Sequence, residues 1–208
     1  MNIQVANLVP VTEAEGPGRR FALWLQGCPL RCPSCCNPEM LSFSGGTKMS
    51  MDELMRMITQ SHQEHQIEGI TLLGGEPFAH AELASELAAQ TQLAGLSVMV
   101  FSGFTMDELR EQQDSHVDRL IDHTDILVDG PYDKTQPDSS RRWIGSLNQR
   151  IHFLTNKYQA EDACWKEPDT LEIRIENGEL SVNGFPAKQA VGVWKRPKNK
   201  PIGDKSAT

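Results

Sequence analysis

Long apolar runs are missing from this chain of 208 residues. No stretch approaches the roughly 20 consecutive apolar residues that a membrane-spanning helix needs. The N-terminal segment also lacks the cationic start and the small-residue cleavage site of a secretory signal peptide. Both absences lead us to expect a cytoplasmic protein without membrane contacts.

An excess of positive charge is missing as well. The formal net charge is −8, which argues against a nucleic-acid partner. Basic residues gather only near the C-terminus, among Pro, Gly, Ser and Thr, in a composition typical of a solvated tail. We therefore expect residues 1–190 to form one domain and residues 191–208 a flexible basic tail.

Cysteine is scarce but unevenly placed. The chain has five, and four of them lie between positions 28 and 36. Thiols stay reduced in the cytoplasm, so this clustering indicates metal ligands or catalytic groups rather than disulfides. Buried structural cysteines are the alternative, but four in such a short segment make it the weaker one.

The spacing is Cys28-x3-Cys32-x2-Cys35, with Cys36 directly following. Three thiolates can hold three irons of a cubane cluster and leave the fourth iron open to a small molecule, whereas a structural cluster takes four. A zinc site, with Cys36 or a histidine as fourth ligand, is the alternative. Adjacent cysteines rarely face one metal together, so we take Cys35 rather than Cys36 as the ligand. Cys164 is distant and expected to be inert.

Apolar runs alternate with helical patterns along the chain. Two capping-box signatures and two 3.6-residue periodicities predict helices, and Asn177-Gly178 predicts a hairpin between two short strands. The order strand, helix, strand, helix predicts an α/β fold with a parallel sheet. The predicted strands are 21–25, 70–73, 97–101, 126–128, 171–175 and 179–182, and the helices start near 50, 81, 105 and 117.

Polar or glycine-rich segments follow four of these strands directly. They are the cysteine loop, Gly74-Gly75-Glu76, Ser102-Gly103 and Asp129-Gly130. The carboxyl ends of parallel strands meet at one edge, where such folds place their sites. Each signal alone has a plainer interpretation as a turn or a cap, but together they predict one site. The segments 141–143 and 148–150 are candidates for binding an anionic group or a partner protein, and equally for a solvated face.

The cysteine motif resembles the CxxxCxxC signature of radical S-adenosylmethionine enzymes. Gly74-Gly-Glu-Pro77 strengthens the resemblance, and further motifs are similar to the activating proteins of anaerobic ribonucleotide reductase. The resemblance spans about residues 14 to 155. The further motifs are Gly16-Pro-Gly18, Gln26-Gly27, Asn37-Pro38-Glu39, Val128-Asp-Gly-Pro131 and Gly145-Ser-Leu-Asn-Gln149.

This resemblance implies an incomplete parallel (β/α) barrel of the radical S-adenosylmethionine type, followed by the C-terminal hairpin. It implies a [4Fe-4S] cluster on Cys28, Cys32 and Cys35. The open iron would chelate S-adenosylmethionine, whose reductive cleavage gives a 5′-deoxyadenosyl radical. Glu76 would bind the ammonium of the methionine moiety. The residues expected to contact S-adenosylmethionine are Ser34, Cys36, Gly74, Gly75, Glu76, Pro77, Ser102 and Asp129.

The implied partner is a glycyl radical enzyme such as anaerobic ribonucleotide reductase, with a flavodoxin or ferredoxin as electron donor. Two departures keep other substrates open: Cys36 stands where the activases commonly carry an aromatic residue, and the segment after Gln149 is longer. One alternative is a radical enzyme acting on a small molecule or peptide, similar to 7-carboxy-7-deazaguanine synthase. Another is a non-enzymatic iron–sulfur or zinc module, although a carrier needs no ligand pocket such as Gly74-Gly75-Glu76 suggests.

Overall fold

The computed structural model describes residues 2–33, 35–176 and 179–184. Seven strands form one sheet in the order β3-β1-β2-β4-β5-β6-β7, and β8 and β9 form a separate hairpin. The strands are β1 Asn2–Thr12, β2 Arg20–Leu25, β3 Thr47–Ser50, β4 Gly69–Gly74, β5 Ser97–Phe101, β6 Ile126–Asp129, β7 Arg150–Phe153, β8 Leu171–Glu176 and β9 Glu179–Gly184. The proposed tail, 191–208, lies outside the described residues.

The four central strands β2, β4, β5 and β6 run parallel, and the flanking strands pair antiparallel. The prediction of an α/β protein with a mostly parallel sheet and a C-terminal hairpin is therefore confirmed. The strand order describes an open sheet with β3 and β7 at its edges, so the incomplete barrel stays a prediction.

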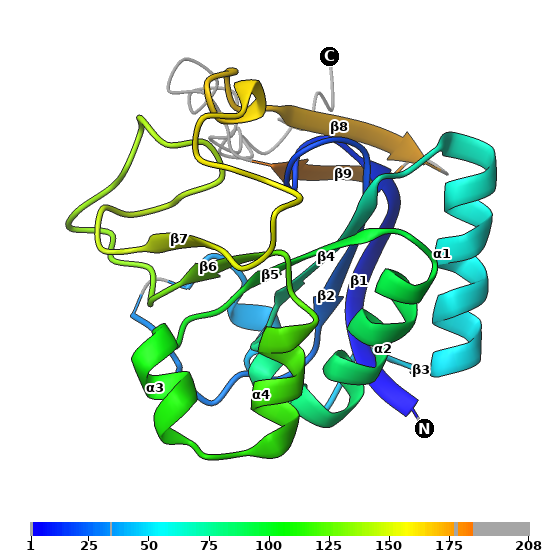
Figure 1. Cartoon of the computed structure of the whole chain (residues 1–208), viewed down its shortest axis with the longest axis horizontal. Coiled ribbons are helices and arrows are strands. Elements are labelled where there is room, and N and C mark those ends of the chain that lie inside the picture. Colours follow the sequence, from blue (N-terminus) through cyan, green and yellow to red (C-terminus); the bar gives the residue numbers. More distant parts are fainter. Residues whose placement is uncertain (1, 34, 177–178, 185–208) are drawn as a thin grey trace, which may run out of the picture.

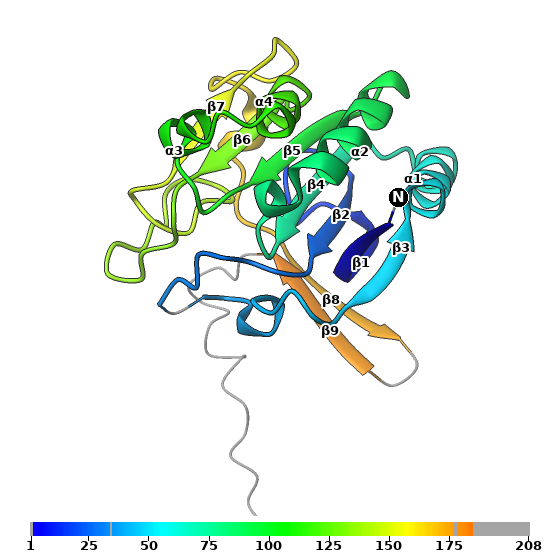
Figure 2. The ribbon, with the colours of Figure 1, turned by 90° about the horizontal axis from the view of Figure 1, so that it is seen from below.

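Helices cover one face of this sheet (Figure 1). Seen from below, α1 to α4 lie on one side of the strands, and the cysteine segment and the β8–β9 hairpin lie on the other (Figure 2). The four helices are α1 Met51–His65, α2 Ala81–Leu93, α3 Met106–Glu111 and α4 Ser115–Asp122, and three short 3₁₀ helices are η1 Pro38–Met40, η2 Pro77–His80 and η3 Ala163–Trp165.

Alternation along the strands separates the two faces. In β5, Val98 and Val100 pack into the main core under the helices, whereas Met99 belongs to a second cluster with Trp143 on the opposite face. The side chains of a central parallel strand are therefore apolar on both faces. This explains why the sequence shows these strands as continuous apolar runs.

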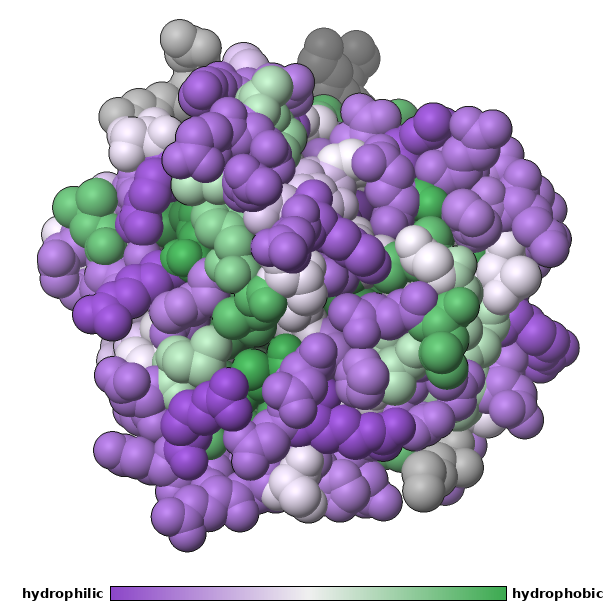
Figure 3. Space-filling model, in the orientation of Figure 1, coloured by the Kyte–Doolittle hydropathy of each residue, from purple (hydrophilic) through white to green (hydrophobic). Residues whose placement is uncertain are grey.

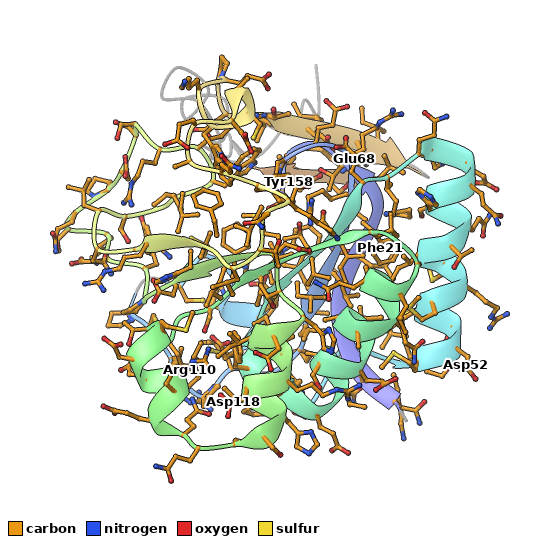
Figure 4. The ribbon with its side chains drawn as sticks, viewed as in Figure 1. Phe21, Asp52, Glu68, Arg110, Asp118 and Tyr158 are labelled. Carbon is orange, nitrogen blue, oxygen red and sulfur yellow. The ribbon has the colours of Figure 1, made fainter. Side chains whose placement is uncertain are left out.

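The helix starts carry the predicted caps. The Ser50 hydroxyl accepts a hydrogen bond from the Glu53 N–H, and Thr105 with Glu108 forms a complete capping box at α3. Arg110 and Asp118 lie next to each other where α3 and α4 meet (Figure 4), with 2.8 Å between Nη1 and Oδ1. The helical face that Figure 3 shows is mostly hydrophilic, with apolar residues in small separate patches.

Three strands were not expected from the sequence: β1, β3 and β7. In β1 the buried residues Ile3 and Val5 alternate with more exposed neighbours, the period-two pattern of a strand with one covered face. β3 and β7 lie at the sheet edges and mix polar or charged residues with apolar ones, so neither shows the continuous apolar run of the equally short β6. Within the described residues, no helix is long and apolar enough to cross a membrane.

Candidate functional site

A cavity of about 810 Å³ lies at the carboxyl end of the parallel strands. Its wall combines the cysteine loop after β2, the ends of β4 and β5, residues between 130 and 149, and Asp169. All four strand-end segments predicted to converge therefore contribute to the wall, the Asp129-Gly130 segment through Gly130 alone. This is the edge at which parallel α/β sheets place their sites.

The cysteine loop is closed by backbone hydrogen bonds to the turn around η1. The Gly27 N–H donates to the Met40 carbonyl at 2.9 Å, and the Cys28 N–H donates to the Leu41 carbonyl at 3.2 Å. Gln26, buried at the end of the strand, donates from its side-chain amide to the carbonyls of Glu39 and Ser42. These contacts hold the loop against the cavity.

Three of the loop's thiols share one environment. Cys28 is buried and Cys32 and Cys35 are half-buried, and all three line the cavity. Burial raises the pKa of the Cys28 and Cys32 thiols, and the neighbouring Cys35 raises both further. Positive charge from a metal would stabilise the thiolate forms that burial disfavours here, so three thiols on one cavity wall fit a metal cluster. Cys36 also lines the cavity but is exposed.

The zinc alternative requires several ligands around one ion. Within the described part of the chain, no three His, Cys, Asp or Glu side chains are grouped in that way. In a cubane cluster each thiolate binds a different iron, so the three thiols need not meet at a single point. Ser34, the predicted contact between the second and third ligands, lies outside the described residues.

Gly74 and Gly75 tie the end of β4 to the cysteine loop. Gly74 has a φ of 100°, which favours glycine. The Gly75 N–H donates to the Leu25 carbonyl at 2.7 Å, and a Cβ on Gly75 would lie 2.3 Å from the Gly27 carbonyl oxygen. The two glycines therefore bring two loops of the site into backbone contact.

Glu76 follows as the central acidic group of the cavity wall. Its carboxylate accepts hydrogen bonds from the Phe78 N–H at 3.0 Å, the Ser102 hydroxyl at 3.0 Å and the Gly103 N–H at 2.8 Å. Burial raises the pKa of Glu76 to about 7, and these three donors act against that rise. Glu76 and Ser102 thus come from the ends of adjacent strands and meet, as expected.

Two other predicted contact residues lie off the cavity wall. Pro77 is buried in the first turn of η2, where its ring helps to start the 3₁₀ helix. The Asp129 carboxylate accepts a hydrogen bond from the Met106 N–H at 2.6 Å and lies 3.0 Å from His152 Nε2. Both contacts involve Oδ2, which bonds the start of α3 and lies beside β7, and Gly130 lines the cavity in place of Asp129. A ligand contact of Asp129 stays a prediction.

The segment 130–149 is held by its own polar side chains. Arg141 donates to the Asp138 carboxylate and to the carbonyls of Ser146, Leu147 and Gln149. The Gln149 side chain accepts from two backbone N–H groups and donates to the Gly130 carbonyl. The Gly145–Gln149 motif and Arg141 therefore build one wall of the cavity.

Trp143, which lies in the candidate binding segment 141–143, and Asp169, to which the sequence did not point, also line the cavity. Trp143 packs edge-to-face on Trp165, with 5.1 Å between ring centroids. Asp169 lies in no motif and far from every other site residue in the chain. Only the fold brings it to the cavity.

Comparison with known proteins agrees with this geometry. Residues 14–152 match the family described as a 4Fe-4S single cluster domain. The anaerobic ribonucleoside-triphosphate reductase-activating proteins of Vibrio cholerae and Escherichia coli K12 are each 31% identical to this chain, over 152 and 153 residues. Each match covers 70% of this chain and 95% of the relative. The protein of the same name from Enterobacteria phage T4 is 24% identical over 163 residues.

The family match covers the cysteine loop, the ends of β4, β5 and β6 and the Gly145–Gln149 motif. It ends before η3 and the hairpin, so Asp169 lies outside it. The chain therefore belongs to the 4Fe-4S single cluster domain family, in the branch of radical S-adenosylmethionine enzymes formed by the activating proteins of anaerobic ribonucleotide reductase.

Proposed function

We propose that this protein activates an anaerobic ribonucleotide reductase by installing a glycyl radical on it. Cys28, Cys32 and Cys35 would hold a [4Fe-4S] cluster. When bound, the cluster would supply the electron for reductive cleavage of S-adenosylmethionine to methionine and a 5′-deoxyadenosyl radical, and this radical would become 5′-deoxyadenosine by taking a hydrogen atom from a glycine of the reductase. The observation that carries the proposal is that these three thiols share one cavity wall with Glu76 and Ser102.

The chain's own residues would position the nucleoside. Glu76 Oε2 accepts one hydrogen bond, from Gly103, and keeps capacity for a second donor such as the ammonium of the methionine moiety. Ser102 already donates to Glu76 and accepts from the Phe104 N–H, so it would orient Glu76 rather than bind the ligand strongly. Gly74 and Gly75 would let the ligand approach the backbone closely.

Water must be kept from a carbon radical. The cavity wall carries the apolar side chains of Leu30, Leu73, Phe101 and Ile144 between its polar groups. Such a wall would exclude water once the nucleoside is bound and would strengthen the electrostatic contact of Glu76. A flavodoxin or ferredoxin is the proposed source of the electron.

The test begins with the protein alone. Purified without oxygen, reconstituted with iron and sulfide and given dithionite, the wild type should convert S-adenosylmethionine to 5′-deoxyadenosine and methionine. Cys32→Ala should bind less iron and form none. Cys36→Ser is the matched control and should keep its iron, because Cys36 is the exposed member of the loop.

The second step adds the anaerobic ribonucleotide reductase of the same organism. A glycine-centred doublet in the electron paramagnetic resonance spectrum is the expected result. Formation of 5′-deoxyadenosine without that doublet would instead favour the alternative of a small molecule or peptide as substrate. Absence of both from a cluster-loaded protein would contradict radical chemistry and favour an electron carrier.

A further inference from the structure

Two buried polar atoms on the cavity wall have no hydrogen-bond partner among the described residues: Trp143 Nε1 and Asp169 Oδ1. Trp143 is 1% exposed, and its Nε1 is a donor only. Leaving such a donor or acceptor buried without a partner is unfavourable. Their neighbours on the wall are satisfied, since Asp138 and Gln149 are each bonded several times. Both residues line the cavity, so a ligand bound there can supply the partners that these atoms lack.

The segment that delivers Asp169 is firmly anchored. Arg142, which is 9% exposed, donates to the Cys164 carbonyl at 2.9 Å, to the Glu167 carboxylate at 3.0 Å and to the Thr170 hydroxyl at 3.0 Å. These contacts fix the chain on both sides of Asp169. Its place on the wall is thus a feature of the packing rather than of an unsupported loop.

Asp169 enters the cavity from the end opposite the cysteines. Its neighbour Thr170 packs against Gly184, and Gly184 packs against Ala14, which precedes β2. The cysteine loop follows β2 at the other end of the same strand. Asp169 is therefore placed to contact whatever lies in the cavity farthest from the cysteines, either the far end of one ligand or a second molecule.

We propose that Trp143 and Asp169 together bind the backbone amide beside the glycine that is to carry the radical, an inference that rests on the proposed function. A glycine has no side chain, so a protein can hold it only through N–H and C=O groups. The Trp143 indole N–H donates to the substrate carbonyl, and the Asp169 carboxylate accepts from the substrate N–H. Because Asp169 lies outside the residues that match the family, this acceptor adapts the chain to its own partner.

The experiment uses the full-length, cluster-loaded protein and its reductase. Asp169→Ala should raise the reductase concentration that gives half-maximal glycyl-radical formation about tenfold, the effect of one lost hydrogen bond to a charged acceptor. Asp169→Asn keeps an acceptor oxygen and should stay within roughly threefold of wild type. Glu161→Ala is the control, because it removes the same charge from an exposed position of the same segment.

Each outcome has a distinct meaning. The inference would be overturned if Asp169→Ala, with a wild-type thermal midpoint, needed the same reductase concentration as the wild type for half-maximal glycyl-radical formation. A parallel loss of 5′-deoxyadenosine in the absence of reductase would also overturn it, by placing Asp169 in the nucleoside site. A loss as large in Asp169→Asn would show that charge, and not the hydrogen bond, is recognised. A wild type that cleaves S-adenosylmethionine but forms no glycyl radical would sink the proposed function instead.

Discussion

Glu15 shows at the scale of one residue how burial overrides charge. It lies in the segment between β1 and β2, 5% exposed, and accepts a hydrogen bond from the Gly184 N–H at 2.8 Å. Burial raises its pKa to about 7, and the carboxylate of Glu172 adds to the rise. The contact joins the hairpin to the segment that precedes β2, so protonation of Glu15 is coupled to folding.

The sign of this coupling is testable. Between about pH 4.5 and 7 the folded protein binds the Glu15 proton more tightly than the unfolded chain, so the stabilisation is complete below 4.5 and is lost as the pH rises through 7. A shift of this size corresponds to at most about 3 kcal/mol. Raising the pH from 5 to 8 should therefore lower the wild-type thermal midpoint by roughly 5 °C more than that of Glu15→Gln.

Glu15→Gln is a close match because the amide oxygen can still accept from the Gly184 N–H. Glu64→Gln, at an exposed position of α1, serves as the control and should follow the wild type at both pH values. Identical pH slopes for Glu15→Gln and the wild type would contradict the assignment.

Between elements, the site depends on how closely two loops approach. The β2–η1 loop carries the cysteines and the β4–η2 loop carries Glu76, and they exchange two backbone hydrogen bonds, Gly75 N–H to Leu25 and Glu76 N–H to Gly27. The ends of β2 and β4 thus contact each other directly through their backbones. The position of Glu76 relative to the cysteines is therefore set by main-chain contact.

Gly75→Ala tests this contact. The added methyl would lie 2.3 Å from the Gly27 carbonyl oxygen, closer than non-bonded atoms pack. The atoms that it meets are backbone atoms, so no side chain can move aside to make room. We expect a loss of about 1–3 kcal/mol in stability and reduced iron binding after reconstitution, measured by thermal unfolding and by iron content.

Gly95→Ala is the comparison for that variant. Its added methyl meets nothing within 4 Å, although a φ of 82° makes it mildly strained. It should lose some stability but bind iron as the wild type does. Equal iron content in both variants would mean that the loop contact does not shape the cluster site.

At the scale of the whole molecule, the segment after residue 152 is an addition to the matched family core, and Arg142 holds it there. Its guanidinium lies 4.1 Å from the Trp143 ring centroid as well as bonding three groups of the segment. The pairing of Trp143 with Trp165 completes the joint. The segment and the cavity wall are thus one packed unit.

Arg142→Ala should release this unit. Hydrogen exchange at backbone amides between 155 and 170 should become faster, and the thermal midpoint should fall by several degrees. The physical reason is a net loss of about 2–3 kcal/mol when a buried charged donor is removed, with little contribution from the exposed Glu167 carboxylate. Arg119→Ala breaks only a surface pair with Glu86, worth at most about 1 kcal/mol, and should leave that exchange unchanged. Unchanged exchange in Arg142→Ala would show that other contacts hold the segment.

Local patterns in the sequence were sufficient for the parallel strands and the four helices, and they put the three cysteines predicted as cluster ligands on one loop. The parallel strands are apolar runs bounded by glycine, the helix starts carry capping residues, and the three cysteines lie within eight positions of one another. Each of these features depends on neighbours along the chain, which is why spacing alone identifies it. The edge strands β3 and β7 escaped because they mix polar and charged residues with apolar ones, unlike the equally short β6, whose first three residues are all apolar.

Tertiary structure alone decided which polar groups face the cavity. The sequence pointed to Asp129, which follows a strand in an Asp-Gly pair, and not to Asp169. In the structure Asp129 Oδ2 accepts a hydrogen bond from the Met106 N–H and lies beside His152, whereas Asp169, on the cavity wall, keeps an unpaired oxygen. The difference depends on which segments pack together across more than a hundred residues, and that is set by the burial of the whole core rather than by any local preference.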